Sequence, residues 1–129
     1  MENMTILPLD AVARLGSDPD AEHDMYRVAI GALDEAMTAS DDLVRVWLDH
    51  EPRLTGNRRA DALVAAVAEH VAFHRDAEIP RWTQHPLRSL ASAWYPVDLP
   101  SIRTRAYVAS PVSFARRLIY IDRLDLERV

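Results

Sequence analysis

The stretch from Asn57 to Arg75 constrains the fold more than any other part of the chain. Its apolar side chains recur every three or four residues, the spacing that places them on one face of an α-helix. The residues of this face are Ala60, Leu63, Val64, Val67 and Val71. Alanine fills much of the rest, has the highest helix propensity and lets neighbouring helices approach closely. With Asn57 as its N-cap and Gly56 before it, the stretch predicts a central core helix, from which Asp61 and Glu69 point away.

Residues 20–75 are expected to form a body of long helices. Apolar periodicity predicts helices over about residues 8–15, 19–39 and 41–50, the last capped by Ser40. Gly31, in the middle of the second helix, costs about 1 kcal/mol relative to alanine, so we expect a close helix crossing there. Residues 1–7 are expected to be a flexible leader.

Residues 80–129 are divided by proline into pieces too short to be stable alone. The pattern predicts a short helix that begins at Pro80 and bears Trp82, and further short helices over residues 87–94, 101–109 and 112–117. In the helix over residues 101–109, Ile102, Ala106 and either Tyr107 or Val108 are expected to face inward. We therefore predict one all-α domain over residues 1–129, a helical bundle around a central helix with short C-terminal helices wrapping it.

Composition excludes several classes of site. The chain contains no cysteine, so it has neither disulfides nor thiolate metal ligands. No apolar run approaches the ~18 residues of a membrane span, and the N-terminus lacks the pattern of a signal peptide. These features favour a cytoplasmic protein with no membrane partner.

Charge is distributed unevenly along the chain. The residues from Arg81 onward include eight arginines and four acidic residues, whereas the first 80 residues hold seven arginines and sixteen acidic residues. The simplest interpretation is that the basic C-terminal part folds onto the acidic body. The alternative is a basic surface for an acidic partner or for phosphates.

No residue pattern indicates catalysis. His70 and His74 lie four residues apart on one helical face, but Val71 stands where a zinc protease has its glutamate. We interpret the pair as structural, and we expect no catalytic residue, cofactor or metal. The chain also lacks a glycine-rich phosphate loop and a Gly-x-Ser-x-Gly turn.

The best candidate for function is a cluster of arginines near the C-terminus, with a tyrosine among them. Arginine and tyrosine are enriched in binding hot spots. The candidate partner-binding residues are Arg103, Arg105, Tyr107, Arg116, Arg117 and Arg123. Residues 101–117 also fit a helix-turn-helix loosely, with Ala109-Ser110-Pro111 as the turn, so DNA binding is an alternative.

From about Trp47 to its end the chain resembles a family of small actinobacterial proteins. The resemblance is carried by Leu54–Leu63, Ala68-Glu69-His70 and Ile79–Thr83, and most distinctively by Trp94-Tyr95-Pro96, Arg103–Ala106 and Ser110–Ile121. That family is associated with toxin–antitoxin loci whose second gene encodes a nucleotidyltransferase-like protein. The family has a glycine where Leu118 stands here.

The resemblance implies an antitoxin-like or accessory role and supplies no catalytic residue. We therefore expect a non-catalytic protein-binding module whose partner is a nucleotidyltransferase-like toxin. The alternatives are a DNA-binding regulator and a metal- or histidine-dependent hydrolase.

Overall fold

The computed structural model describes residues 5–126, and its centre is the helix α4 (Arg58–His74). Asn57 caps this helix, because its side-chain oxygen accepts hydrogen bonds from the backbone N–H groups of Arg59 and Ala60 at 3.0 and 3.2 Å. Every residue from Ala60 to Ala72 is buried, so α4 is enclosed on all sides. The predicted core helix is confirmed, but the expectation that Asp61 and Glu69 point out of the core is wrong.

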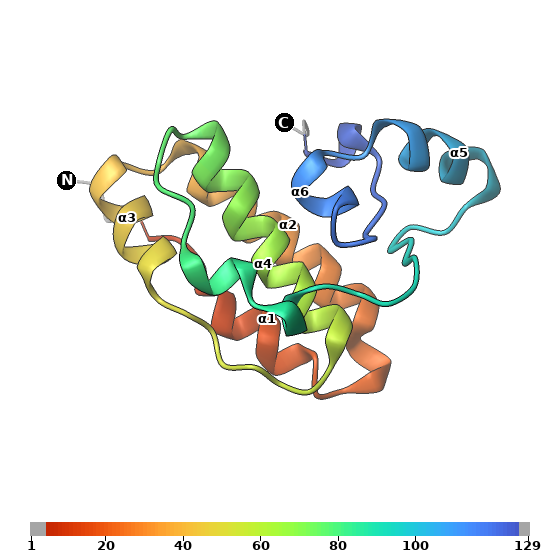
Figure 1. Ribbon diagram of the computed structural model, residues 1–129, viewed down its shortest axis with the longest axis horizontal. Coiled ribbons are helices and arrows are strands. Elements are labelled where there is room, and N and C mark those ends of the chain that lie inside the picture. Colours follow the sequence, from red (N-terminus) through yellow and green to blue (C-terminus); the bar gives the residue numbers. More distant parts are fainter. Residues whose placement is uncertain (1–4, 127–129) are drawn as a thin grey trace.

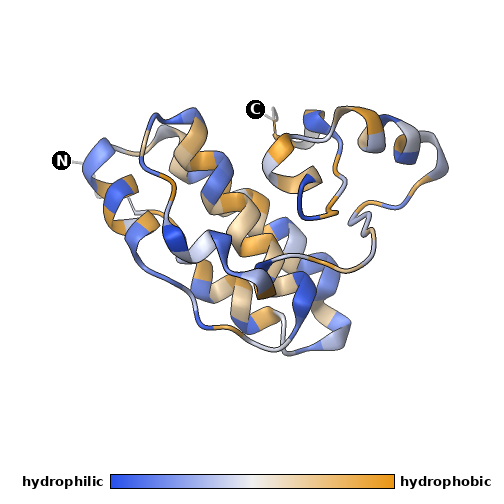
Figure 2. Cartoon of the chain, viewed as in Figure 1, coloured by the Kyte–Doolittle hydropathy of each residue, from blue (hydrophilic) through white to orange (hydrophobic). Residues whose placement is uncertain are grey.

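The N-terminal body consists of α1 (Leu9–Leu15), a 3₁₀ turn η1 (Pro19–Ala21), α2 (Glu22–Thr38) and α3 (Asp41–Asp49). Both α1 and α2 pack against α4 and against each other (Figure 1). Apolar residues cover the sides that face the interior, while most outward positions are hydrophilic (Figure 2). Ser40 caps α3 as predicted, accepting a hydrogen bond from the Leu43 N–H at 3.3 Å.

The segment before α1 is held against the body. The N–H of Leu7 donates to the Glu35 carboxylate at 2.7 Å. The carbonyl of Leu7 accepts a hydrogen bond from the indole N–H of Trp47 at 3.0 Å. Ile6 and Leu7 also pack against the core. The prediction of a flexible leader is therefore corrected for residues 5–7, and residues 1–4 lie outside the described part of the chain.

The C-terminal part contains two 3₁₀ turns, η2 (Arg81–Gln84) and η3 (Pro86–Arg88), then α5 (Pro100–Ala109), α6 (Val112–Ala115) and the turn η4 (Arg123–Leu126). The helix predicted over residues 87–94 is wrong, since only η3 forms there. An isolated parallel bridge instead joins Trp94 to Ile119, through Trp94 N–H to Leu118 O and Tyr120 N–H to Trp94 O, both 2.9 Å. No strand forms within residues 5–126, and the all-α prediction is confirmed.

None of the helices in residues 5–126 has the length and apolar character needed to cross a membrane.

The close helix approach occurs at Gly16 rather than at Gly31. A Cβ atom added at Gly16 would overlap the Cβ of Ala60 and lie 3.1 Å from the Ala13 carbonyl oxygen. Gly31 is exposed and has nothing within 4 Å of such an atom. The crossing predicted at Gly31 is wrong, because the Gly31 face of α2 points to solvent.

The two glycines predict opposite effects of the same substitution. Gly31→Ala should raise the free energy of unfolding by about 1 kcal/mol, because alanine restricts the unfolded chain and favours helix. Gly16→Ala should lower it by about 1–3 kcal/mol, because the added methyl overpacks the contact between α1 and α4. Urea unfolding of both variants checks the prediction, and equal effects would contradict the assignment of Gly16 to the crossing.

Candidate functional site

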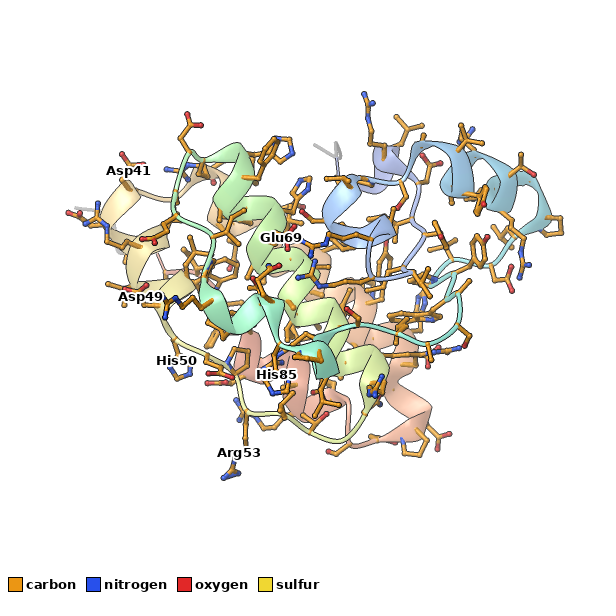
Figure 3. The ribbon with its side chains drawn as sticks, in the orientation of Figure 1. Asp41, Asp49, His50, Arg53, Glu69 and His85 are labelled. Atoms are coloured by element: carbon orange, nitrogen blue, oxygen red, sulfur yellow. The ribbon has the colours of Figure 1, made fainter. Side chains whose placement is uncertain are left out.

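Glu69 is the centre of a buried polar cluster between α4 and the C-terminal part (Figure 3). Its carboxylate accepts hydrogen bonds from Arg117 at 2.8 Å, from Arg116 at 2.9 Å on both oxygens, and from the Gln84 amide at 2.9 Å. The Ser113 hydroxyl adds a longer hydrogen bond at 3.3 Å. We call these five residues the Glu69 centre. It joins α4 to η2 and to the α6 segment, which lie far from it in the sequence.

The Glu69 centre keeps its carboxyl group ionised. Burial by itself would raise the pKa of Glu69, since it disfavours the charged form. Hydrogen bonds from Gln84, Arg117 and Arg116, together with the charge of Arg117, outweigh burial and place the pKa below its ordinary value. This carboxylate is therefore a structural anion rather than a proton donor.

Arg117 lies in the interior and is unable to contact a partner. It is 2% exposed, and besides Glu69 it donates to the backbone carbonyls of Ser113, Thr83 and Arg88 at 2.8, 2.7 and 3.1 Å. The expectation that Arg117 belongs to a binding surface is corrected. These hydrogen bonds hold the side chain inside, directly before the left-handed turn at Leu118 (φ +66°).

Arg88, which the sequence did not single out, is buried beside Arg117. Its guanidinium group lies 4.9 Å from the ring centroid of Trp82 and donates to the carbonyl of Pro52 at 2.6 Å. Its Nε–H has no hydrogen-bond partner among the described residues. Arg88 therefore links η3 to the loop before α4 rather than to solvent.

The other predicted arginines stay at the surface, and Arg103, Arg105 and Arg116 pair with acidic side chains of this chain. Arg103 forms a bidentate pair with Asp98 at 3.0 and 2.9 Å, and Arg105 pairs with Asp122 at 2.9 Å. Arg116 is half exposed and pairs with Glu69. Arg123 is exposed on η4. Much of the C-terminal positive charge is thus matched within the fold, only part of it by the acidic body.

Three of the four tyrosines gather at the surface of the C-terminal part. The rings of Tyr95 and Tyr120 stack with centroids 5.3 Å apart, and Tyr107 lies 5.1 Å from Tyr120. The guanidinium carbon of Arg103 lies 4.4 Å from the centroid of Tyr95. We call Tyr95, Tyr107, Tyr120 and Arg103 the tyrosine row. It brings together two of the predicted residues, Arg103 and Tyr107.

The helix α5 carries two of the four residues of the tyrosine row, Arg103 and Tyr107, and is weakly enclosed. It lies at the edge of the molecule, at the opposite end from α3 (Figure 1). Ala106 is its only buried residue, and Ile102 is half-buried. Tyr107 and Val108 are 62% and 78% exposed, so the expectation that one of them faces inward is wrong. An ordered helix thus presents an aromatic and an aliphatic side chain to solvent.

The geometry of α6 argues against the helix-turn-helix alternative. A recognition helix must lie in the DNA major groove with a polar outer face. Here α6 has four residues, and both Ser113 and Phe114 are buried against the body.

His70 and His74 lie together on α4, with ring centroids 4.2 Å apart. Burial, and then the proximity of His74, lower the pKa of His70 from 6.5 to about 4. Both rings line a cavity of about 440 Å³, as does Arg123, and no described carboxylate lines it. Nowhere in residues 5–126 do three or more His, Cys, Asp or Glu side chains gather as a metal site would require.

Sequence reasoning missed the partners that complete these sites. Tyr95 and Tyr120 come from loops on either side of α5 and α6, and only the bridge between residues 94 and 119 brings them together. Glu69 appeared to lie on an exposed face of its helix. The one available signal was the alanine content of that face, which is typical of a helix buried on all sides.

Comparisons with protein-family models, curated proteins and solved structures found no match.

The Glu69 centre predicts a large effect of Glu69→Gln. Removing the charge leaves Arg117 buried without an anion, so the free energy of unfolding should fall by about 3–5 kcal/mol at pH 7. Because the pKa of Glu69 is lowered on folding, this contribution is complete above its ordinary pKa near 4.5 and is lost as pH falls through the folded value. Urea unfolding against pH measures it. Asp42→Asn, which breaks an exposed pair with Arg45, is the control and should change stability by less than about 1 kcal/mol.

His70 predicts a second pH dependence at higher pH. Because its pKa falls from 6.5 to about 4 on folding, its contribution is complete above pH 6.5 and is lost as pH falls toward 4. Across this window the free energy of unfolding of the wild-type protein should fall by about 3 kcal/mol. The His70→Gln variant should not show this fall. Substitution of the exposed His23 by glutamine should leave the pH dependence of the free energy of unfolding unchanged. If His70→Gln keeps the wild-type pH dependence, His70 is not its cause.

Proposed function

We propose that the protein is a non-catalytic protein-binding module of the cytoplasm, the antitoxin-like or accessory member of a toxin–antitoxin-type pair. It binds its partner through the tyrosine row and the exposed face of α5. The observation that carries the proposal is the exposure of Tyr107 and Val108 on an ordered helix whose only buried residue is Ala106.

Such a surface suits protein binding for two reasons. Exposed apolar side chains gain free energy when a partner covers them, at roughly 25 cal/mol per Å². Tyr95 and Tyr120 already stack on each other, and Tyr107 lies against Tyr120, so little conformational entropy is lost on binding. The sequence resemblance to proteins of toxin–antitoxin loci supports the same role and names a nucleotidyltransferase-like protein as the partner.

The paired arginines belong to the rim of this surface. Arg103 and Arg105 keep their carboxylates, Asp98 and Asp122, at contact distance. Rim ion pairs contribute little affinity but select partner charge and orientation. Arg116, half exposed above Glu69, is less available because its guanidinium group also donates to Gln84 at 3.0 Å. Of the predicted binding residues, those on α5 therefore remain the candidates for partner contact.

DNA binding is the second candidate, because tyrosine rings stack on bases. It is less favoured because the side chains of Arg103, Arg105 and Arg116 are each occupied by a carboxylate of this chain. A titration with DNA of the protein's own promoter separates the two: specific DNA binding would weaken linearly in log salt.

The proposal predicts opposite outcomes for two matched substitutions. Val108 on α5 and Val46 on α3 are both valines with most of their surface in solvent. Val108→Glu and Tyr107→Ala should each weaken binding of the adjacent gene's product by about 2 kcal/mol, roughly thirtyfold, because they remove contacts at the centre of the surface. Val46→Glu should leave the affinity unchanged.

Co-expression, pull-down and titration calorimetry of the three variants provide the measurement. Circular dichroism shows whether each variant keeps its helices. If the adjacent gene's product fails to co-purify with the wild-type protein, the proposed pairing is rejected. Binding that survives both Tyr107→Ala and Val108→Glu moves the interface away from α5.

A further inference from the structure

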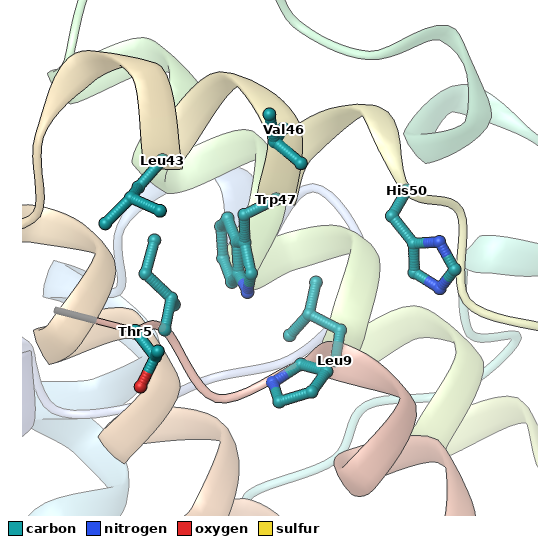
Figure 4. Close-up of a pocket in the computed structure, with 8 residues that line it drawn as sticks. Thr5, Leu9, Leu43, Val46, Trp47 and His50 are labelled. Atoms are coloured by element: carbon teal, nitrogen blue, oxygen red, sulfur yellow. The ribbon is translucent and has the colours of Figure 1, made fainter. Parts of the chain in front are cut away.

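A second surface feature lies near α3, at the opposite end of the molecule from α5 (Figure 1). It is formed where the N-terminal segment and α1 meet α3 (Figure 4). Here a cavity of about 370 Å³ is lined mainly by apolar side chains. Leu9 and Trp47 are buried at its wall, whereas Val46 is 70% exposed at its rim. This volume lies within the range of roughly 300–1,000 Å³ that small-molecule sites occupy.

The wall of this cavity has a satisfied polar group and an apolar surface. The indole N–H of Trp47 donates to the Leu7 carbonyl at 3.0 Å, which fixes the ring. The ring faces Leu43, Val46 and Leu9 around the cavity (Figure 4). A ligand that fills this space must therefore be apolar along most of its length, because only Thr5 and His50 offer polar side chains that line it.

His50 connects this cavity to a second one. His50 also lines an adjoining cavity of about 830 Å³, together with Arg14 and Arg53. The carboxylates of that cavity have partners: Asp10 contacts the His50 imidazole at 2.7 Å, and Glu51 lies 3.5 Å from Arg88.

The two arginines of the second cavity have no such partner. Arg14 and Arg53 are exposed, and neither guanidinium group forms an ion pair with a side chain of residues 5–126. Arg53 lies on the same side of the molecule as His50 (Figure 3). Two arginines that form no ion pair with residues 5–126 therefore adjoin the apolar cavity, and they favour an anionic group on the ligand.

We propose that the two cavities together bind a small amphiphilic carboxylate of the medium-chain fatty-acid class. Its hydrocarbon chain lies against Trp47 between α1 and α3, and its carboxylate lies beyond His50 near Arg14 and Arg53. The site is independent of the tyrosine row, which lies at the opposite end of the molecule.

The test uses sodium octanoate with the full chain. Calorimetry should show saturable binding to one site, and NMR should show a shift of the Trp47 indole N–H signal. Octylammonium, with the same chain and the opposite charge, should bind at least tenfold more weakly. Val46→Glu, which places a carboxylate at the rim, should weaken octanoate binding at least tenfold, and Arg53→Glu should weaken it several-fold.

Two controls make the test specific. Arg45 lies on α3 beside Val46 but lines neither cavity. Arg45→Glu should therefore leave the affinity for octanoate unchanged. Val108→Glu should do the same, although it is expected to weaken partner binding. Absence of saturation below the micellar concentration, equal binding of octylammonium, or indifference to Val46→Glu would each overturn the proposal.

Discussion

The rest of the structure depends on the buried ion pair between Glu69 and Arg117. These residues are 48 positions apart in the sequence, and their contact fixes the C-terminal part on the central helix. Removing two charges from water costs several kcal/mol for each ion. Arg116 and Gln84 offset this cost on the carboxylate side, and three backbone carbonyls offset it on the side of Arg117. The pair is therefore a device for positioning as much as for stability, because the hydrogen bonds of Arg117 reach α4, η2, η3 and α6 together.

That positioning extends to the candidate binding surface. The chain leaves Arg117 through the turn at Leu118 and immediately pairs with Trp94 on both sides of Ile119. Tyr120 follows and stacks on Tyr95, and this stack supports Tyr107. A loss of the Glu69 centre should therefore also disorder the tyrosine row, even though the two sites share no residue. This coupling explains how an α5 that buries only one side chain keeps a defined position.

The sequence was informative where structure is determined locally. The period and cap of α4 and the cap of α3 follow from neighbouring residues, as does the helix expected over residues 101–109, which forms as α5. It was uninformative where contacts are distant, since nothing near Glu69 indicates that Gln84, Arg116 and Arg117 enclose it. Likewise, Gly31 looked like the site of a helix crossing, and only the packing of α1 on α4 shows that Gly16 makes the close contact.

Leu118 shows how the distant contacts override local preference. Its φ of +66° lies in the left-handed region, where any residue other than glycine is strained by roughly 1–2 kcal/mol. Leucine is held in this conformation, because its N–H donates to Ala115 O and its carbonyl accepts from Trp94 N–H, both at 2.9 Å. These bonds and the adjacent Arg117 contacts outweigh the strain, so the turn is imposed by the Glu69 centre rather than by the residue that occupies it.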